Sequence, residues 1–512
     1  PVGLSSGGFS FDMDVFGFKS RGADLGFHLS YLSSAAGWRS SVAARWTHTY
    51  DQKLVLKITE GPVINPYPGP GDTGGGGVPP AGGGEGDPIQ TYEWNLYHYQ
   101  NLTIDMYALD PGQLDAWNPV DGGTLKVRGS EAVSYEPTEL SPTYFKTRSA
   151  SGLEIKWQKV SWELGDLLCQ QWDTVTYRPI RIADPAGTVL HLEYETHTVQ
   201  NHCHIQGTGL FRRLSKVRDE LGGFLSFTYD NGGRGFLERV EDHTGRFATL
   251  GRDGHGNLTS VTRPEVWTTA DGQAPTALVS ETRFTYAPAI PNVDNSEHRL
   301  ESVTSPNEVG DGSLVPYVVN TWEPSGQRVI RQHYGGTNAS GIPAGGHFDY
   351  LYQESTHDWG WFVEAARTLV IDPNGNVSLS IFDEELRVRL EYTFAGRVAH
   401  PVTPGVSSIS SLVSVNPSNY QQGGSLLSGS APMGSNDGSA HVTRFDYHKG
   451  MIVRKETADF IEEYVFDSNA IDRHQRFNLL VVKRTSRLNP ADVIVSGSAV
   501  SRSFTKDAIP MA

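Results

Sequence analysis

A run of histidine and cysteine residues is the part of this sequence that comes closest to metal chemistry. His202, Cys203 and His204 are adjacent, and His191 and His197 precede them. Zinc favours imidazole and thiolate ligands, but adjacent residues of a strand point to opposite faces, so Cys203 does not easily join both neighbours. Ordinary surface histidines are the simpler interpretation. We therefore predict no metal site and no cofactor.

Candidate catalytic groups are abundant but show no recognisable arrangement. The 58 acidic residues allow a glycosidase-type carboxylate pair, yet the sequence contains no G-x-S-x-G, H-E-x-x-H or P-loop pattern. Cys203 beside two histidines resembles a nucleophile and its base only superficially, because three-dimensional approach defines such a pair. We expect no intrinsic enzyme, and a carbohydrate-active β enzyme is kept as the third alternative.

Aromatic residues gather at 357–362, where Trp359 and Trp361 are two residues apart. Such a pair can form a platform on which sugar rings stack. The simpler interpretation is a strand whose two tryptophans lie on one face of a sheet and pack there, since exposed aromatic patches are uncommon unless they are used.

The strongest signal in the chain is a repeat of 23 residues that starts at Leu214. Leu214-x-x-Val217-x-Asp219-x-x-Gly222 returns as Leu237-x-x-Val240-x-Asp242-x-x-Gly245. Each glycine is followed seven residues later by Tyr229-Asp230 or Arg252-Asp253, and then by Gly233 or Gly256. Partial copies place Asp184, Gly187 and Tyr194, and then Asp372, Gly375, Phe382 and Asp383, at the same spacing. A repeat of this length is typical of a stacked architecture.

Each position of the repeat has a structural explanation. An aspartate that accepts hydrogen bonds from nearby backbone and a glycine three residues later, free to adopt positive φ, build a tight turn between strands. The aromatic residue covers the neighbouring hairpin. One unit is then a two-stranded hairpin that is stable only when stacked on its neighbours. We interpret the repeated aspartates as turn formers and not as catalysts.

Composition agrees with an all-β fold. The chain has 56 glycines and 29 prolines for its turns, and 21 tyrosines, 21 phenylalanines and 11 tryptophans, which favour strands. The net charge of −16 disfavours nucleic acid as a partner. No apolar run approaches the length of a membrane span. Cys169 and Cys203 form a disulfide or remain two separate thiols, and the sequence does not decide between them.

Changes of composition divide the chain. We predict a leading β segment at 1–61, a flexible Gly/Pro-rich insertion at 62–88, a repeat-built β-shell at 89–400, a Ser/Gly-rich loop or linker at 401–440, and degenerate repeat strands at 441–512. The glycine tract of the insertion lacks the flanking strand, helix and lysine of a phosphate loop. Residues 144–147 and 153–157 flank Ser151-Gly152 and predict a hairpin. No signal peptide is visible, and the start at Pro1 suggests a processed product or an excised segment.

These repeats resemble the YD-repeat, or Rhs, family. Arg21-Gly22-x-x-Leu25-x-Phe27-x-Leu29-x-Tyr31 and Trp46-Thr47-His48-x-Tyr50-Asp51 are similar to the segment that precedes the repeats in Rhs proteins. The resemblance implies a long spiralling β-sheet that is part of a hollow shell, as in bacterial Rhs proteins, insecticidal toxin complexes and teneurins. Some bacterial members are cleaved just before the shell, and the closing segment with its self-cleaving aspartate is not found before Ala512.

The resemblance also implies a function. We expect a shell segment of a secreted or cell-surface bacterial protein that encloses a polypeptide cargo, the toxic C-terminal domain. The alternative is a cell-surface adhesion or glycan-binding scaffold, in which Trp359 and Trp361 would contact surface glycans. A component of a secretion system is a further expected partner.

Overall fold

The chain is described by a computed structural model, in which most of the length is placed. The described residues are 2–19, 24–35, 40–64, 89–100, 103–109, 118–120, 125–129, 143–149, 152–160, 174–200, 208–230, 235–268, 276–278, 280–310, 312–336, 345–405, 409–412, 440–448, 451–457, 459–466, 479–486 and 493–497.

The described residues form an almost entirely β structure, as the composition predicts. Three strands make a small N-terminal sheet of order β1-β2-β3, and a long antiparallel ladder runs from β4 to β32, leaving aside the separate pair β18-β19. Strand β11 also pairs with β4, which links the beginning of the ladder to its eighth strand. The strands of the N-terminal sheet are β1 (Ser10–Phe18), β2 (Leu25–Leu32) and β3 (Trp46–His48).

The ladder begins with strands that include the predicted hairpin at 144–157. Strands β9 and β10 pair antiparallel around Gly152, whose amide donates to the Ser149 carbonyl, so this prediction is confirmed. The first strands are β4 (Lys53–Ile64), β5 (Ile89–Gln100), β6 (Thr103–Leu109), β7 (Asn118–Val120), β8 (Leu125–Gly129), β9 (Tyr144–Ser149), β10 (Glu154–Lys159) and β11 (Thr174–Ala183).

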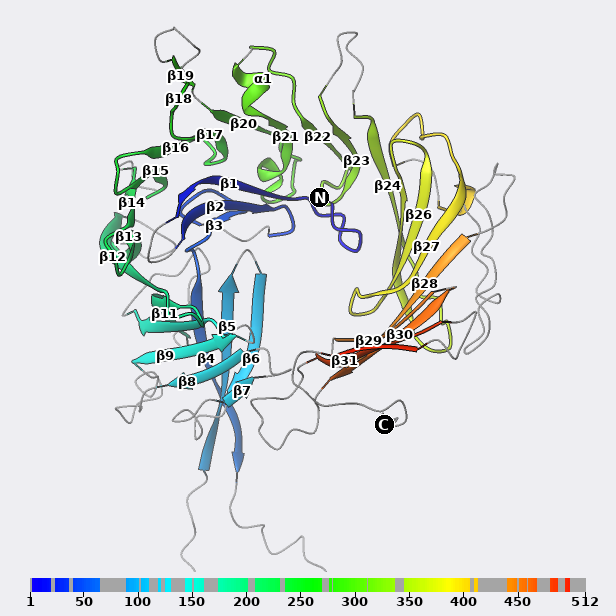
Figure 1. The fold of residues 1–512 in the computed structure, drawn as a ribbon, viewed down its shortest axis with the longest axis horizontal. Coiled ribbons are helices and arrows are strands. Elements are labelled where there is room, and N and C mark those ends of the chain that lie inside the picture. Colours follow the sequence, from blue (N-terminus) through cyan, green and yellow to red (C-terminus); the bar gives the residue numbers. More distant parts are fainter. Residues whose placement is uncertain are drawn as a thin grey trace, which may run out of the picture.

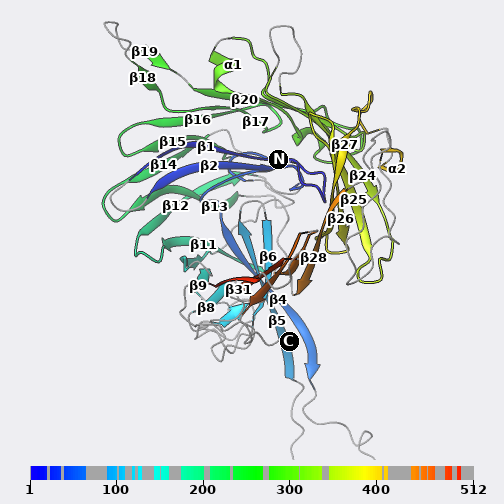
Figure 2. The same cartoon turned by 45° about the vertical axis from the view of Figure 1, so that its right-hand side comes forward.

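The middle of the ladder curves around the N-terminal sheet, and we call it the covered arc (Figures 1 and 2). It comprises β12 (Val189–Gln200), β13 (Thr208–Asp219), β14 (Phe224–Tyr229), β15 (Leu237–Asp242), β16 (Phe247–Arg252), β17 (Leu258–Thr262), β20 (Glu281–Tyr286), β21 (Leu300–Thr304), β22 (Val318–Trp322) and β23 (Val329–Tyr334), with β18 (Val266–Thr268), β19 (Thr276–Leu278), the 3-10 helix η3 (Ser296–His298) and α1 (Pro306–Gly310) between them.

The ladder then passes through the pivot strand β24 into a second part, which we call the open arc (β25 to β28). The pivot strand is β24 (His347–Glu354). The open arc consists of β25 (Glu364–Ile371), β26 (Asn376–Asp383), β27 (Val388–Arg397) and β28 (Ala440–His448), with α2 (Ile409–Leu412) between β27 and β28. The last strands of the ladder are β29 (Met451–Glu456), β30 (Phe460–Phe466), β31 (Leu479–Ser486) and β32 (Val493–Gly497). No helix among the described residues has the length and apolarity that a bilayer crossing requires.

In the covered arc the sheet buries its inner face, the face turned toward β1–β3 and the centre of the molecule. Phe27 and Trp46 of the N-terminal sheet share one core with Phe227, Val240 and other inward residues of the arc. Trp46 is fully buried, packs its ring edge against Phe284, and donates its indole N–H to the Tyr286 hydroxyl at 2.9 Å. The N-terminal sheet is thus an internal cover for this part of the wall.

In the open arc the sheet buries its outer face instead. Leu369, Leu379 and Leu390 form a second core with Ile409 of α2, and α2 lies on the outside of the molecule (Figure 2). The pivot strand carries both arrangements: Tyr350 belongs to the inner core, and its neighbour Leu351 belongs to the outer one. Because neighbouring residues of a strand point to opposite faces, the core changes side at β24.

The predicted division of the chain is not tested by these elements, but two of its boundaries fall inside strands. The boundary predicted at 440/441 falls inside β28, which begins at Ala440. Strand β4 belongs to the main ladder and continues to Ile64, so it runs across the boundary predicted at 61/62. Residues 65–88 and 413–439, most of the two predicted loops, are outside the described residues.

Candidate functional site: the inner wall and a histidine cluster

The repeated aspartates and glycines occupy one position of one kind of turn. In the example of Asp242, Oδ1 accepts the amides of Thr244 and Arg246, the Asp242 carbonyl accepts the amide of Gly245, and Gly245 has φ 87°. The same carbonyl bond to the third residue along is found at Asp184, Asp253 and Asp372, with Gly187, Gly256 and Gly375 at positive φ. Asp219 Oδ1 accepts the amides of Leu221 and Gly223, and Gly222 also has positive φ. Hydrogen bonds from the Thr244 and Arg246 side chains and amides lower the pKa of the Asp242 carboxyl despite its burial.

Asp383 makes the same turn without a glycine. Its Oδ1 accepts the amide of Arg387, and its carbonyl accepts the amide of Leu386, which takes the left-handed conformation at φ 59°. Asp230 accepts the amide of Phe236 and so bridges a longer connection. Gly233, predicted to complete that turn, is outside the described residues.

The aromatic position of the repeat ties each strand to an earlier one. The Tyr229 hydroxyl donates to the Leu214 carbonyl at 2.7 Å, and the Tyr194 hydroxyl donates to the Pro179 carbonyl at 3.0 Å. Arg252, which stands where the repeat has tyrosine, donates to the Leu237 carbonyl. In each of these three cases the acceptor precedes the donor by 15 residues.

A β-bulge accompanies this position, a feature that the sequence did not reveal. The register shifts immediately before Tyr194, Tyr229, Arg252, Tyr286, Trp322, Phe382 and Tyr447. Because a bulge bends its strand and increases the local twist, its recurrence at the aromatic position gives the sheet a regular curl.

The tryptophan segment differs from the prediction. Asp358 and Val363 form an isolated bridge, with Gly360 at φ 80° between them, so 359–361 is a tight turn and not a strand with two tryptophans on one face. The turn packs on the outer core. Trp359 donates to Glu364, and the guanidinium of Arg444 lies 3.9 Å from the centre of the Trp361 ring. The chain itself therefore occupies much of the surface that a glycan would need.

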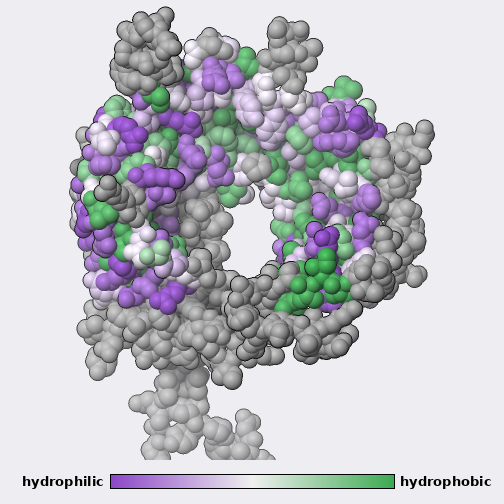
Figure 3. Space-filling model, viewed as in Figure 1, coloured by the Kyte–Doolittle hydropathy of each residue, from purple (hydrophilic) through white to green (hydrophobic). Residues whose placement is uncertain are grey.

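The inner face of the open arc is lined mainly by small polar side chains. Thr368 pairs with Ser380, Ser380 with Glu391, and Glu391 with Thr443 across four consecutive strands. The next row consists of Val370, Ser378, Thr393 and His441. Thr368, which donates to the Leu4 carbonyl, and Ser380 are buried, whereas Glu391, Thr393 and His441 are exposed. The space-filling view shows an opening through the middle of the molecule, with the open arc at its right (Figure 3).

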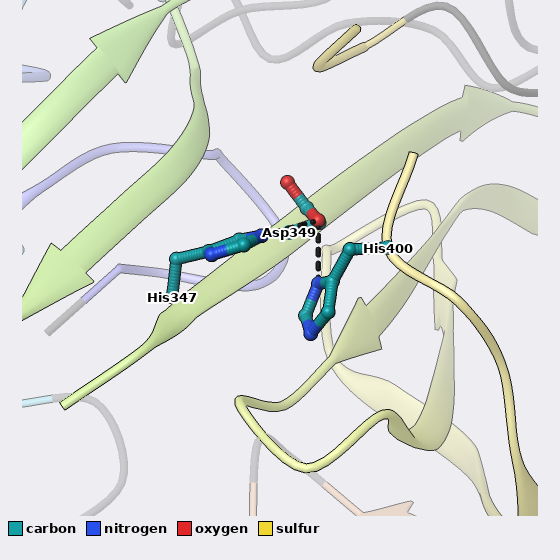
Figure 4. Close-up of side chains that lie close together, drawn as sticks. All are labelled: His347, Asp349 and His400. Carbon is teal, nitrogen blue, oxygen red and sulfur yellow. Dashed lines mark hydrogen bonds and ion pairs between the residues drawn. The ribbon is translucent and has the colours of Figure 1, made fainter. Parts of the chain in front are cut away.

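A cluster of histidines lies on the outer face at the pivot strand. His347 and Asp349 are two residues apart on β24, and His400 reaches them from the segment after β27 (Figure 4). His400 Nδ1 and Asp349 Oδ2 are 2.7 Å apart, and His347 Nε2 is 3.4 Å from the same oxygen. Arg331 donates to both oxygens of the buried Asp349 carboxylate, at 2.6 and 3.0 Å.

The environment favours the neutral form of two of the imidazoles, those of His347 and His333. Burial, the nearby His400 and Arg331 lower the pKa of His347 to about 4, and burial also lowers the pKa of His333, whose ring lies 5.0 Å from that of His347. His333 and His347 are directly paired across β23 and β24. The cluster is assembled from three separated segments, and its only sequence signal is the two-residue spacing of His347 and Asp349. The predicted cluster at 202–204 and both cysteines are outside the described residues.

Comparison with known proteins finds solved structures that are similar at low sequence identity. No family model and no curated protein matches this chain. The structure of TcdB2-TccC3 without its hypervariable C-terminal region is similar over 77% of this chain and 19% of its own, with 11% identity and a TM-score of 0.28. The N-terminal domain of the effector protein SpvB from Salmonella typhimurium strain LT2 is similar over 55% of this chain and 94% of its own, with 10% identity and a TM-score of 0.24.

This chain therefore spans about a fifth of the length of the TcdB2-TccC3 chain that it matches. At these identities and TM-scores the likeness does not extend to function, which has to be inferred from the residues of this chain.

Proposed function

We propose that this chain is a non-enzymatic wall segment of a β-shell that encloses a polypeptide cargo, the toxic C-terminal domain of a secreted Rhs-type protein. The observation that carries the proposal is the inner face of the open arc. Its polar side chains are exposed along β27 and β28, at Glu391, Thr393 and His441, beside a central opening.

The chemistry of this surface suits an enclosure. An apolar wall would bind an unfolded or partly folded cargo through the hydrophobic effect, whereas serine, threonine and glutamate side chains remain hydrated and release it. Where the inner face is apolar, in the covered arc, the chain's own sheet β1–β3 buries it. Confinement would then be steric and electrostatic.

The absence of intrinsic catalysis is part of the proposal and is supported by the use of the aspartates. Asp219, Asp242, Asp253 and Asp372 accept backbone amides within their own turns. Residues with the same structural role in successive units are poor candidates for acid–base catalysis.

The proposal is tested by comparing two threonines with opposite orientation. Thr393 of β27 is exposed on the inner face, and Thr228 of β14 is exposed on the outer face, since its neighbours Phe227 and Tyr229 point into the inner core. A photo-cross-linking amino acid is introduced at one position or the other in the full-length product of the gene. Cross-linked peptides are then identified by mass spectrometry.

We expect the Thr393 position to cross-link to a segment of the same product outside the wall, and the Thr228 position not to do so. Cross-links to such a segment from both positions, or from neither, would overturn the enclosure.

A further inference from the structure

We propose that His347, Asp349 and His400 form a binding site for a divalent transition-metal ion of the zinc class, which fastens the segment around His400 to the outer face of the wall. This inference is independent of any cargo. It starts from the one cluster among the described residues in which histidine and carboxylate ligand atoms all lie within 4.8 Å of one another.

Two of the three distances between ligand atoms are close to those of tetrahedral coordination, and the distance between the two imidazole ligand atoms lies within 4.8 Å. A zinc ion with bonds of about 2.0–2.1 Å holds its ligand atoms about 3.3–3.4 Å apart. His347 Nε2 and Asp349 Oδ2 already stand 3.4 Å apart. His400 Nδ1 is 2.7 Å from the same oxygen, so His400 has to withdraw by only about 0.6 Å for the same spacing.

An unpaired nitrogen atom of His347 supports a missing ligand at this cluster. His347 Nε2 and His400 Nε2 are buried and have no hydrogen-bond partner, and the same holds for His333 Nδ1 beside them. Buried polar atoms in proteins are nearly always paired, and an exception calls for an explanation such as an ion or a water molecule. Of the three, only His347 Nε2 belongs to the ligand set, where it lies 3.4 Å from Asp349 Oδ2 and would be paired by a bound metal ion. His400 would bind through Nδ1, on the side of its ring that meets Asp349.

The surroundings resemble the support of a metal site. Metal-bound carboxylates are themselves oriented by hydrogen bonds from neighbouring residues, and Arg331 orients Asp349 with two of them. Arg331 also offsets the charge of Asp349, so the cluster does not attract cations by net charge. The ligand set has two imidazoles and only one carboxylate. Calcium and magnesium prefer several oxygen ligands, so neither is a favoured occupant.

Metal binding would fix the segment around His400 to strand β24. Arg331 already donates to the Pro401 carbonyl at 2.7 Å, and Val398 and Ile409 on either side of His400 belong to the outer core. A metal ion between β24 and His400 would join this covering segment to the strand at which the core changes side.

The test is titration of the full chain with zinc chloride, by calorimetry and by metal analysis after dialysis. We expect one ion per chain, and thermal stabilisation that EDTA reverses, since a ligand that binds only the folded state stabilises it. His400→Ala, in a segment without regular structure, and the nearly isosteric Asp349→Asn should each weaken binding by more than about 100-fold, beyond the cost of losing a supporting residue.

His441→Ala, which removes an exposed histidine from β28, is the matched control and should bind zinc as the unchanged chain does. Circular dichroism verifies that each variant is folded. Absence of stoichiometric zinc binding by the unchanged chain, or equal binding by the folded His400→Ala variant, would show that the cluster is an ordinary hydrogen-bonded group.

Discussion

The covered arc and the open arc belong to one continuous sheet but bury opposite faces. In the covered arc, inward residues such as Phe227 pack on the N-terminal sheet. In the open arc, outward residues such as Leu379 pack under α2 and the tryptophan turn. A curved sheet needs only one buried face, and the choice of face decides where its inner surface is free. Among the described residues, the inner face that its own core leaves free is therefore that of the open arc.

The largest expected effect comes from removing the cover of the covered arc. Trp46→Ala deletes a fully buried ring and its hydrogen bond to Tyr286. We expect a loss of about 3–5 kcal/mol in the free energy of unfolding, measured by urea denaturation. Hydrogen exchange should accelerate in β12–β23 and remain slow in β25 and β26. Equal acceleration in both arcs would show that the two cores unfold as one unit.

A second expected effect concerns the dependence of stability on pH in the covered arc. Burial lowers the pKa of His48, which stacks on Phe227 at the base of the cover, from 6.5 to about 4. The unfolded chain therefore takes up this proton more readily than the folded chain. The stabilisation contributed by neutral His48 is complete above pH 6.5 and is lost as the pH falls toward 4, by about 3 kcal/mol at most.

The measurement compares the unfolding free energy at pH 7 and pH 4.5 for the unchanged chain and for His48→Gln. The variant should show the smaller loss. His347, whose pKa is also lowered, titrates in both proteins, so its contribution cancels in the difference. Identical losses would mean that His48 is not the acid-sensitive group of the cover.

The smallest difference concerns two turn glycines of equal conformation. A Cβ at Gly375, in the open arc, would lie 2.6 Å from the Val398 carbonyl, whereas a Cβ at Gly245 would meet nothing closer than 4.0 Å. Both substitutions to alanine place an L-residue at positive φ, which costs about 1–2 kcal/mol. Gly375→Ala should cost about 1–2 kcal/mol more because the covering backbone has to move. Equal denaturation midpoints for the two alanine variants would show that the backbone at Val398 moves without an energetic cost.

Much of the wall was predictable because its turns are encoded locally. Asp219 and Gly222, and Asp242 and Gly245, stand at the spacing that one turn requires, and the all-β fold follows from many such turns. The turn at Asp383 was harder to recognise because Leu386 adopts a conformation that usually indicates glycine. Arg252 was counted in the repeat, but its bond to the Leu237 carbonyl, which replaces that of a tyrosine, depends on three-dimensional contact.

The side on which the core lies was not predictable. Leu379 and Phe227 both alternate with polar residues along their strands, and alternation alone does not distinguish the inside of a curve from its outside. The histidine cluster was missed for a related reason. His333, His347 and His400 are brought together by strand register and by a segment that folds back across the sheet, and neither is visible in a local pattern.

The recurrent bulge at the aromatic position has a consequence for the size that such a wall can reach. Each 23-residue unit contributes one hairpin, which widens the wall by about 9–10 Å, together with a fixed increment of bending. The length of such a wall along its curve is then set by the number of units encoded in the gene. Duplication or loss of a unit changes that length while the chemistry of every turn stays the same.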